Sequence, residues 1–121
     1  MGGMLGARCA CGYDAGSICA GGGMLDFETC FAIPAHCGHC RKLVVVNYLN
    51  KRLICPTCRR KVLPYDDPQL RKSLTPREQA KIQHLFDWSH GGKSFSLEGC
   101  DYLCPSCGEF RLRFEDIGCW D

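Results

Sequence analysis

Short apolar runs that alternate with polar residues indicate that most of this chain is β-structure. The clearest run lies near the C-terminal end, where Phe110, Leu112 and Phe114 alternate with two arginines. The other runs are rich in β-branched or other apolar residues, and Pro34 is expected to end one of them. The predicted strands lie within residues 15–20, 25–33, 43–49, 61–65 and 103–114.

One segment, residues 75–90, predicts a helix instead. It opens with the residue types and spacing of a capping box, with proline at the first helical position, namely Thr75, Pro76 and Glu78. An apolar face with i, i+3, i+4 spacing follows, formed by Ile82, Leu85 and Phe86. The glycines at 91 and 92 are expected to end the helix. The predicted fold class is a small, metal-stabilised, β-rich α+β domain with one helix.

Twelve cysteines in 121 residues are the strongest chemical signal in the sequence. Two Cys-x2-Cys pairs are separated by fourteen residues, and the segment between them predicts a hairpin that turns at Asn50-Lys51. Such a hairpin would place two tight loops face to face, and four thiolates at tetrahedral corners bind zinc. The predicted central metal ligands are Cys37, Cys40, Cys55 and Cys58.

A second metal site follows because one Cys-x2-Cys pair cannot fill a four-coordinate zinc site alone. The pair at 104 and 107 repeats the central pattern at an offset of 49, since Ile-Cys-Pro-Thr-Cys at 54–58 aligns with Leu-Cys-Pro-Ser-Cys at 103–107. The only other closely spaced cysteines form a Cys-x-Cys near the N-terminal end. The predicted terminal ligands are Cys9, Cys11, Cys104 and Cys107.

Other side chains stay open as alternative ligands. Four cysteines have no close partner in the sequence, and each is expected to be a small buried apolar residue that could also replace Cys9 or Cys11. Two histidines, His36 and His39, flank the first central loop, where four cysteines already suffice. The unpaired cysteines are Cys19, Cys30, Cys100 and Cys119.

The two sites predict how the chain is divided. A terminal zinc ribbon would combine residues 7–29 with 98–121, a central ribbon would cover 30–65, and the helix at 75–90 would pack on both. Leu, Ile, Val and Phe are too sparse for a thick core, so metal coordination is expected to take its place. Structural zinc contributes about 10–16 kcal/mol per site, more than an ordinary domain's stability, so the metal-free chain should be largely unfolded.

The cysteine loops resemble the knuckles of zinc-ribbon and rubredoxin-like proteins. The resemblance covers residues 8–13, 36–63 and 102–114, and it carries over only the eight metal ligands. It implies a structural module of the kind found in transcription, translation and RNA-processing machinery or in larger assemblies. Rubredoxin-like iron electron transfer is an alternative, because all-sulfur tetrahedral sites also suit iron. However, Arg59 stands where rubredoxins usually have glycine.

The net charge of +2 hides a strong asymmetry. Residues 36–81 contain eleven lysines or arginines against three acidic residues, a net of +8, whereas the remainder carries −6. A one-sided block of this kind favours an anionic partner. Cations close to the cysteines could also offset the negative charge of a zinc bound by four thiolates.

Nucleic acid is the partner class expected first, because lysine and arginine neutralise phosphates and Tyr48 or Tyr65 could stack on bases. The main alternative is a protein–protein adaptor or accessory subunit of a larger complex, in which the positive surface meets an acidic partner. The expected nucleic-acid-binding residues are Arg41, Lys42, Lys51, Arg52, Arg59, Arg60 and Lys61.

Enzymatic activity is not expected. The sequence contains no His-Glu-x2-His, Gly-x-Ser-x-Gly or phosphate-binding Gly-x4-Gly-Lys motif, and no small-molecule substrate is evident. Catalytic zinc keeps one position open for water, whereas four-cysteine sites are closed. The first residues lack the features of a secretory signal and no apolar run reaches membrane-spanning length, so we expect a cytoplasmic protein without a membrane partner.

Overall fold

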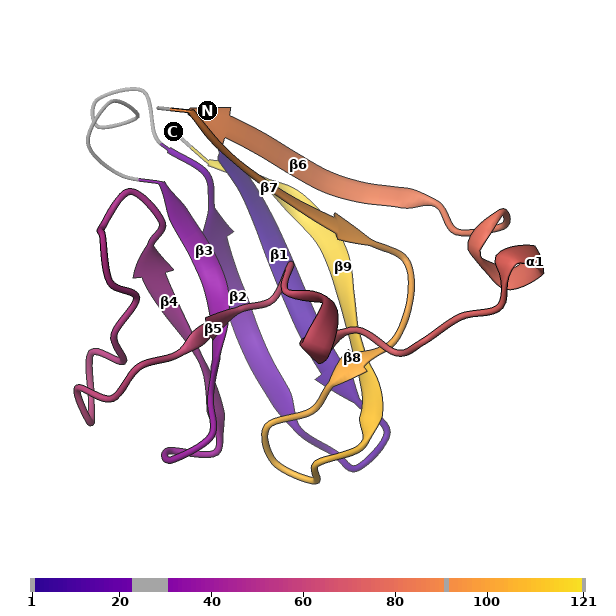
Figure 1. Cartoon of the computed structure of the whole chain (residues 1–121), viewed down its shortest axis with the longest axis horizontal. Helices are drawn as coiled ribbons and strands as arrows, with labels where there is room; N and C mark the ends of the chain where they lie inside the picture. Colours follow the sequence, from indigo (N-terminus) through magenta and orange to yellow (C-terminus); the bar gives the residue numbers. More distant parts are fainter. Residues whose placement is uncertain (1, 23–30, 91, 121) are drawn as a thin grey trace.

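The computed structural model describes residues 2–22, 31–90 and 92–120, and these are predominantly antiparallel β-structure. The strands of the described part form three sheets; two of them enclose an apolar core, and the third is a hairpin that adds buried residues to the same core (Figure 1). The β-rich character predicted from the sequence is therefore confirmed.

The largest sheet joins segments from the two ends of the sequence (Figure 1). Its two central strands, β1 and β9, pair antiparallel from Gly2 opposite Trp120 to Cys9 opposite Leu112. Leu5, Ala7 and Leu112 are fully buried, so one face of this sheet forms part of the core. The strands, in the order in which they pair, are β2 (Asp14–Ala20), β1 (Gly2–Cys9), β9 (Phe110–Trp120) and β8 (Tyr102–Leu103).

The second sheet has the order β4 (Lys42–Asn47), β3 (Ala32–Cys37), β5 (Leu63–Pro64). β4 pairs with β3 along its whole length, so the predicted hairpin between 43–49 and 52–54 is wrong. β3 is buried at five of its six positions and is therefore the partner that lets β4 bury Val44 and Val46. Residues 53–55 pair locally with 60–62 instead, through Val62 N–H to Leu53 O at 3.0 Å and Cys55 N–H to Arg60 O at 2.8 Å.

Pro34 lies inside β3 and does not end a strand, contrary to the prediction. Its carbonyl oxygen faces β5 and accepts a hydrogen bond from the Tyr65 N–H at 3.1 Å. In an antiparallel strand the N–H and C=O of one residue point to the same side. The N–H that proline lacks would therefore face β5, so no hydrogen bond between β3 and β4 is lost. Most of the strand predicted over residues 25–33 lies outside the described residues.

Aromatic side chains fill the space between the two larger sheets. Tyr65 is fully buried, and its ring packs edge-on against Phe114 at 5.2 Å and Tyr102 at 6.2 Å between centroids. Phe31 and Phe95 are also almost fully buried and extend the same apolar cluster. The chain therefore forms a larger apolar core than its composition suggested.

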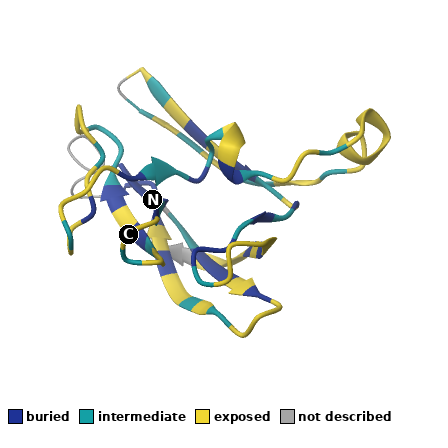
Figure 2. Ribbon diagram, turned by 60° about the horizontal axis from the view of Figure 1, so that its bottom comes forward, coloured by how far each residue is buried: buried dark blue, intermediate teal, exposed yellow. Residues whose placement is uncertain are grey.

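The helix predicted over residues 75–90 is wrong beyond its first turn. The capping box is present, since Thr75 Oγ1 accepts a hydrogen bond from the Glu78 N–H at 3.2 Å. However, α1 (Pro76–Gln79) has only four residues, none of them buried, and lies at one end of the molecule as an exposed turn (Figures 1 and 2). No helix among the described residues is long and apolar enough to cross a membrane.

The rest of the predicted helix is a strand. β6 (His84–His90) pairs with β7 (Lys93–Glu98) as an antiparallel hairpin, in which half-buried Phe86 and Trp88 alternate with exposed residues. β7 contributes Phe95 and Leu97, which are buried. Burial with a period of two against a partner strand therefore outweighs the helical spacing of the apolar residues.

Candidate metal centres

The central cluster contains the four thiols grouped by the Cys-x2-Cys spacing: Cys37, Cys40, Cys55 and Cys58. Their Sγ atoms all lie within 4.8 Å of one another. Across the cluster, Cys37 Sγ is 3.6 Å from Cys58 Sγ, and Cys40 Sγ is 3.8 Å from Cys55 Sγ. A tetrahedral zinc ion with Zn–S bonds of about 2.3 Å separates its sulfurs by about 3.8 Å. The four thiols therefore fit a tetrahedral metal ion.

The terminal cluster is built from the two ends of the sequence: Cys9, Cys11, Cys104 and Cys107. The β1–β9 pairing places the Cys-x-Cys loop after β1 next to the Cys-x2-Cys loop between β8 and β9. Cys9 Sγ is 3.7 Å from Cys107 Sγ, and Cys11 Sγ is 3.8 Å from Cys104 Sγ. The shorter first loop thus still presents both of its sulfurs to the same point.

Each cysteine loop ends in the same local turn. The residue after the second cysteine has a positive φ angle, with values of 54°, 62°, 102° and 73° at Arg41, Arg59, Gly12 and Gly108. Its N–H donates to the carbonyl oxygen of the first cysteine at 2.9–3.0 Å, which closes the loop and turns both thiols to one side. Glycine adopts this conformation easily, whereas arginine does so at a cost of about 1–2 kcal/mol.

Backbone N–H groups point at some of the sulfurs. The Cys40 N–H lies 3.4 Å from Cys37 Sγ, the Thr57 N–H 3.4 Å from Cys55 Sγ, and the Cys11 N–H 3.5 Å from Cys9 Sγ. Such donors stabilise the thiolate form that binds metal and also hold the ligand in place.

The thiols within one cluster do not ionise alike. Backbone N–H donors from Cys58 and Thr57 lower the pKa of Cys55 to about 6, while burial raises the pKa of Cys40 to about 12. In the terminal cluster, the backbone N–H of Tyr13 lowers the pKa of Cys11 to about 7, while burial raises the pKa of Cys9 to about 12. Four adjacent thiolates need a compensating cation, and a divalent metal ion supplies one.

Among the described residues, three hydrogen bonds link the surroundings of the two clusters. The Arg41 guanidinium donates to the Ser106 carbonyl oxygen at 2.7 Å, and the Tyr13 hydroxyl accepts from the Leu43 N–H at 2.9 Å. The third runs from the Tyr65 hydroxyl to the Leu103 carbonyl oxygen at 2.9 Å. Each bond joins a residue next to one cysteine loop, or the buried core behind it, to a residue next to the other. The clusters are thus parts of one structural unit.

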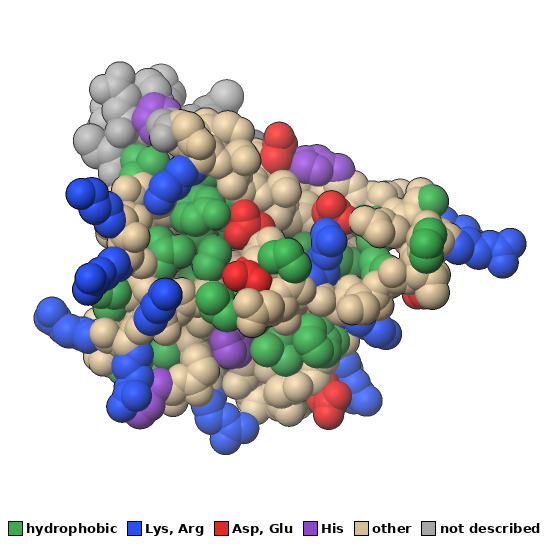
Figure 3. Space-filling view, viewed as in Figure 1, with side chains coloured by type: hydrophobic (Ala, Val, Ile, Leu, Met, Phe, Trp, Pro, Cys, Tyr) green, Lys and Arg blue, Asp and Glu red, His purple; other side chains and the backbone are tan. Residues whose placement is uncertain are grey.

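Five of the seven predicted basic residues form an exposed group that we call the basic lobe. All five lie in the irregular segments on either side of the second central cysteine loop, and no carboxylate among the described residues pairs with them. Figure 3 shows lysine and arginine side chains projecting along the edge of the molecule near β4 and β5. The basic lobe consists of Lys51, Arg52, Arg59, Arg60 and Lys61.

The other predicted contact residues are placed differently. Arg41 is engaged by Ser106, whereas Lys42 is exposed on β4. Tyr65 is fully buried and cannot stack on a base. Tyr48 is partly buried; its hydroxyl contacts Asp66 at 3.5 Å, and the Lys93 ammonium lies 5.1 Å from its ring centroid. The predicted stacking role is therefore wrong for Tyr65 and unsupported for Tyr48.

An apolar surface within the basic lobe was missed by the sequence reasoning. A groove of about 590 Å³ has an apolar floor that includes Ile54, Val62 and Leu63, and four lysines or arginines of the basic lobe line it. Ile54 is 43% exposed. The signal in the sequence is an apolar pair, Leu53-Ile54, that directly follows two cations and precedes a cysteine loop ending in three more.

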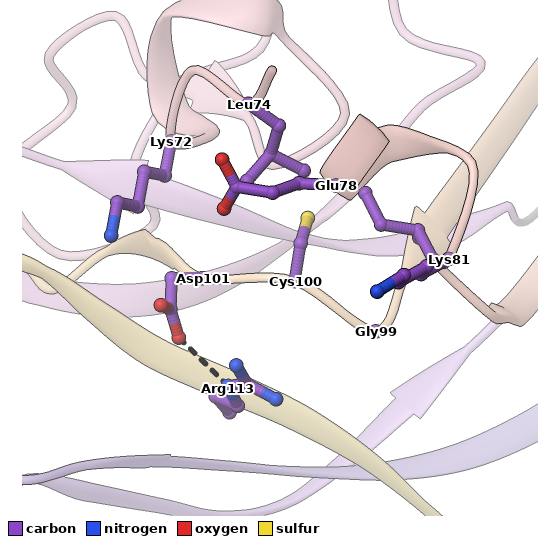
Figure 4. A pocket seen from close by; sticks show the side chains of 9 residues that line it. Lys72, Leu74, Glu78, Lys81, Gly99, Cys100, Asp101 and Arg113 are labelled. Atoms are coloured by element: carbon purple, nitrogen blue, oxygen red, sulfur yellow. Dashed lines mark hydrogen bonds and ion pairs between the residues drawn. The ribbon is translucent and has the colours of Figure 1, made fainter. Parts of the chain in front are cut away.

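A second hollow lies beside α1 (Figure 4) and has mixed charge. It measures about 270 Å³, and one of its acids, Asp101, is paired with Arg113 at 2.7 Å. The Cys100 thiol points into it, and burial raises the pKa of this thiol. The hollow is therefore lined by a protonated thiol, three cations and two acidic residues.

The unpaired cysteines are not all buried as predicted. Cys100 is buried, but Cys19 is exposed on β2. Cys30 and the side chain of Cys119 lie outside the described part of the chain.

The chain matches no protein-family model, no curated protein and no solved structure. The zinc-ribbon resemblance therefore rests on the two four-cysteine groups, whose geometry suits metal sites.

Proposed function

We propose that this protein is a non-enzymatic zinc module that binds an anionic macromolecule on the basic lobe. The observation that carries the proposal is the position of five exposed cations, which no carboxylate of the described residues pairs with, on segments adjoining the central cysteine cluster. The cluster holds the backbone of these segments, and the cations supply long-range attraction for a negatively charged partner.

The metal has a structural role in this proposal. Four cysteine sulfurs complete the tetrahedral shell of zinc and leave no position for water or substrate, so Lewis-acid catalysis has no place to occur. The chemistry that zinc supplies when bound is the neutralisation of four thiolates that otherwise repel one another. The side chains of the basic lobe then provide the binding surface.

Nucleic acid and an acidic protein are the two partner classes for this surface. Phosphates would be neutralised by the basic lobe, but Tyr65 is fully buried and Tyr48 is partly buried, so recognition would rest mainly on contacts with phosphates. An acidic protein is favoured by the apolar floor between the cations. Iron electron transfer is the third candidate, and a purified ferric four-thiolate protein would be red whereas the zinc form is colourless.

Metal content is the first test. Native mass spectrometry of the purified chain should show two zinc ions, and a chelator should remove both together with the cooperative thermal transition. Cys104→Ser, which removes a predicted ligand, should lose zinc and stability. Cys19→Ser is the matched control because Cys19 is exposed and belongs to neither cluster. Full metal content and stability in Cys104→Ser would contradict the terminal site.

Retention on an immobilised polyanion tests the surface. The chain should bind heparin at low ionic strength and elute as salt screens the cations. The double variant Lys51→Glu, Arg52→Glu should elute at lower salt than the double variant Arg77→Glu, Lys81→Glu. The second variant changes the net charge by the same amount, but at the opposite end of the molecule near α1 (Figure 1). Equal elution of the two variants would remove the basic lobe from the proposal.

A further inference from the structure

Ile54 stands exposed at the centre of the basic lobe. It is 43% exposed, and Val45, which lines an adjoining hollow with it, is 41% exposed. The backbone around Ile54 is held by a bridge to Lys61 and by the hydrogen bond between Cys55 and Arg60. An exposed aliphatic side chain on a backbone fixed in this way is a pre-formed contact point.

Three hollows meet at this side chain. The groove of about 590 Å³ lies on one side, and a hollow of about 340 Å³ that includes Val45 and Pro56 lies on another. A third, of about 280 Å³, lies towards Arg59. Ile54 lines all three, so an apolar group from a partner could lie against it from either side.

The residues lining these hollows carry one sign of charge. Lys51, Arg52, Arg59 and Lys61 line them, and none of the lining residues in the described part of the chain is acidic. Apolar contact at the centre with charged residues at the margin is the usual arrangement of a protein interface. Phosphate groups of a nucleic acid would match the margin but would find no partner in the aliphatic floor.

We infer that the hollows around Ile54 bind a peptide segment in which acidic residues flank a bulky aliphatic residue. This inference rests on the proposed function and specifies its partner. The aliphatic side chain packs against Ile54 and the groove floor, while the flanking carboxylates meet the cations of the basic lobe. Affinity comes from burial of the aliphatic group, and selection of acidic sequences comes from the charges.

Three synthetic peptides and one oligonucleotide test the inference by fluorescence anisotropy with the zinc-loaded chain. The peptides have equal length and consist of alternating glutamate and leucine, alternating glutamate and serine, and alternating lysine and leucine. The oligonucleotide is single-stranded poly-dT. The glutamate–leucine peptide should bind tightest, with at least tenfold weaker binding of the glutamate–serine peptide, since burial of one leucine side chain changes Kd by about tenfold or more.

Variants locate the contact. Ile54→Ser should weaken binding of the glutamate–leucine peptide about tenfold while changing its salt dependence little. Lys51→Glu with Arg52→Glu should weaken it by about tenfold and flatten its salt dependence. Arg77→Glu with Lys81→Glu is the control and should leave binding unchanged. Zinc content and thermal midpoint confirm that each variant is folded.

The outcomes separate the inference from the proposed function. Tight poly-dT binding that the Lys51→Glu, Arg52→Glu variant abolishes, with no preference for leucine over serine peptides, overturns the inference but leaves an anion-binding module. Unchanged peptide affinity in Ile54→Ser also overturns it. Failure of every anionic probe to bind overturns both.

Discussion

Arg41 and Arg59 occupy a backbone conformation that glycine adopts more easily, and each follows the second cysteine of a central loop. At the corresponding places in the terminal cluster the chain has Gly12 and Gly108. The central loops thus carry a strain of about 1–2 kcal/mol at each arginine. Both arginines also have another role, since Arg41 reaches Ser106 and Arg59 lines the groove. The strain therefore lies at two arginines whose side chains also bond to the terminal loop or line the groove.

Replacing Arg59 by glycine should stabilise the fold. We expect Arg59→Gly to raise the free energy of unfolding by about 1 kcal/mol, because the left-handed strain disappears. Arg60→Gly is the control, since the neighbouring residue is not among those with positive φ and should lose stability on gaining backbone freedom. Chemical denaturation of the zinc-saturated variants measures both. A loss of stability in Arg59→Gly equal to that in Arg60→Gly would contradict the strain argument.

At the scale of residues, the spacing of the cysteines predicted the metal ligands because the two sulfurs of one loop are close in the sequence. Cys-x2-Cys spacing predicts which sulfurs share a loop, and Cys9 and Cys11 were assigned by elimination to the partners that the structure places beside them. The exposure of Ile54 could not be predicted, because it depends on how residues 53–55 pair with 60–62. Tyr65 was misjudged for the same reason, since burial of its ring is a property of the assembled core.

At the scale of elements, residues 75–90 show how local signals compete with tertiary packing. The capping box forms as predicted, but it stabilises only four residues because α1 buries none of its side chains. After it, Phe86 fits both a helical face with Ile82 and Leu85 and a strand in which it alternates with Trp88. In the sequence, two glycines followed by the alternation of Phe95 and Leu97 indicate a hairpin, and the partner strand decides between the two interpretations.

The exposure of α1 leads to a prediction about its cap. Removal of an N-cap usually costs about 1 kcal/mol. For Thr75→Ala we expect a change in global stability below about 0.5 kcal/mol, because α1 can unfold locally without disturbing the core. Amide exchange around residues 76–80 should accelerate in the variant. The contrasting variant is Tyr65→Phe, which removes the hydrogen bond from the buried Tyr65 hydroxyl to the Leu103 carbonyl oxygen and should cost about 1 kcal/mol globally. A large global loss in Thr75→Ala would show that α1 is packed more firmly than its exposure indicates.

At the scale of the whole molecule, the two clusters are connected rather than independent. Hydrogen bonds from Arg41, Leu43 and Tyr65 reach residues beside the terminal loops. The sequence allowed the eight cysteines to be divided into two sets. The hydrogen bonds between residues beside the two clusters arise from packing of the two larger sheets, and the spacing of residues does not predict them. Ordering one cluster therefore positions parts of the other before its metal binds.

Metal loading should consequently be cooperative. With less than one zinc per site, native mass spectrometry should show mainly the metal-free and two-zinc forms. Tyr13→Phe removes the acceptor of the Leu43 N–H and should increase the one-zinc form. Tyr48→Phe is the control, since its hydroxyl contacts Asp66 and links no cysteine loops. A random distribution of zinc over the two sites in the unmodified chain would show that the clusters bind independently.

The pairing of β1 with β9 determines the order in which the two cysteine clusters can assemble during synthesis. Cys9 and Cys107 are 98 positions apart, whereas Cys37 and Cys58 are only 21 apart. At ribosomal speeds of about 5–20 residues per second, the first thiols to emerge wait roughly 5–20 s for their partners, long after the central set can close. During that interval Cys9 and Cys11 lack their partner ligands, which leaves both thiols open to capture by other metals or by oxidants.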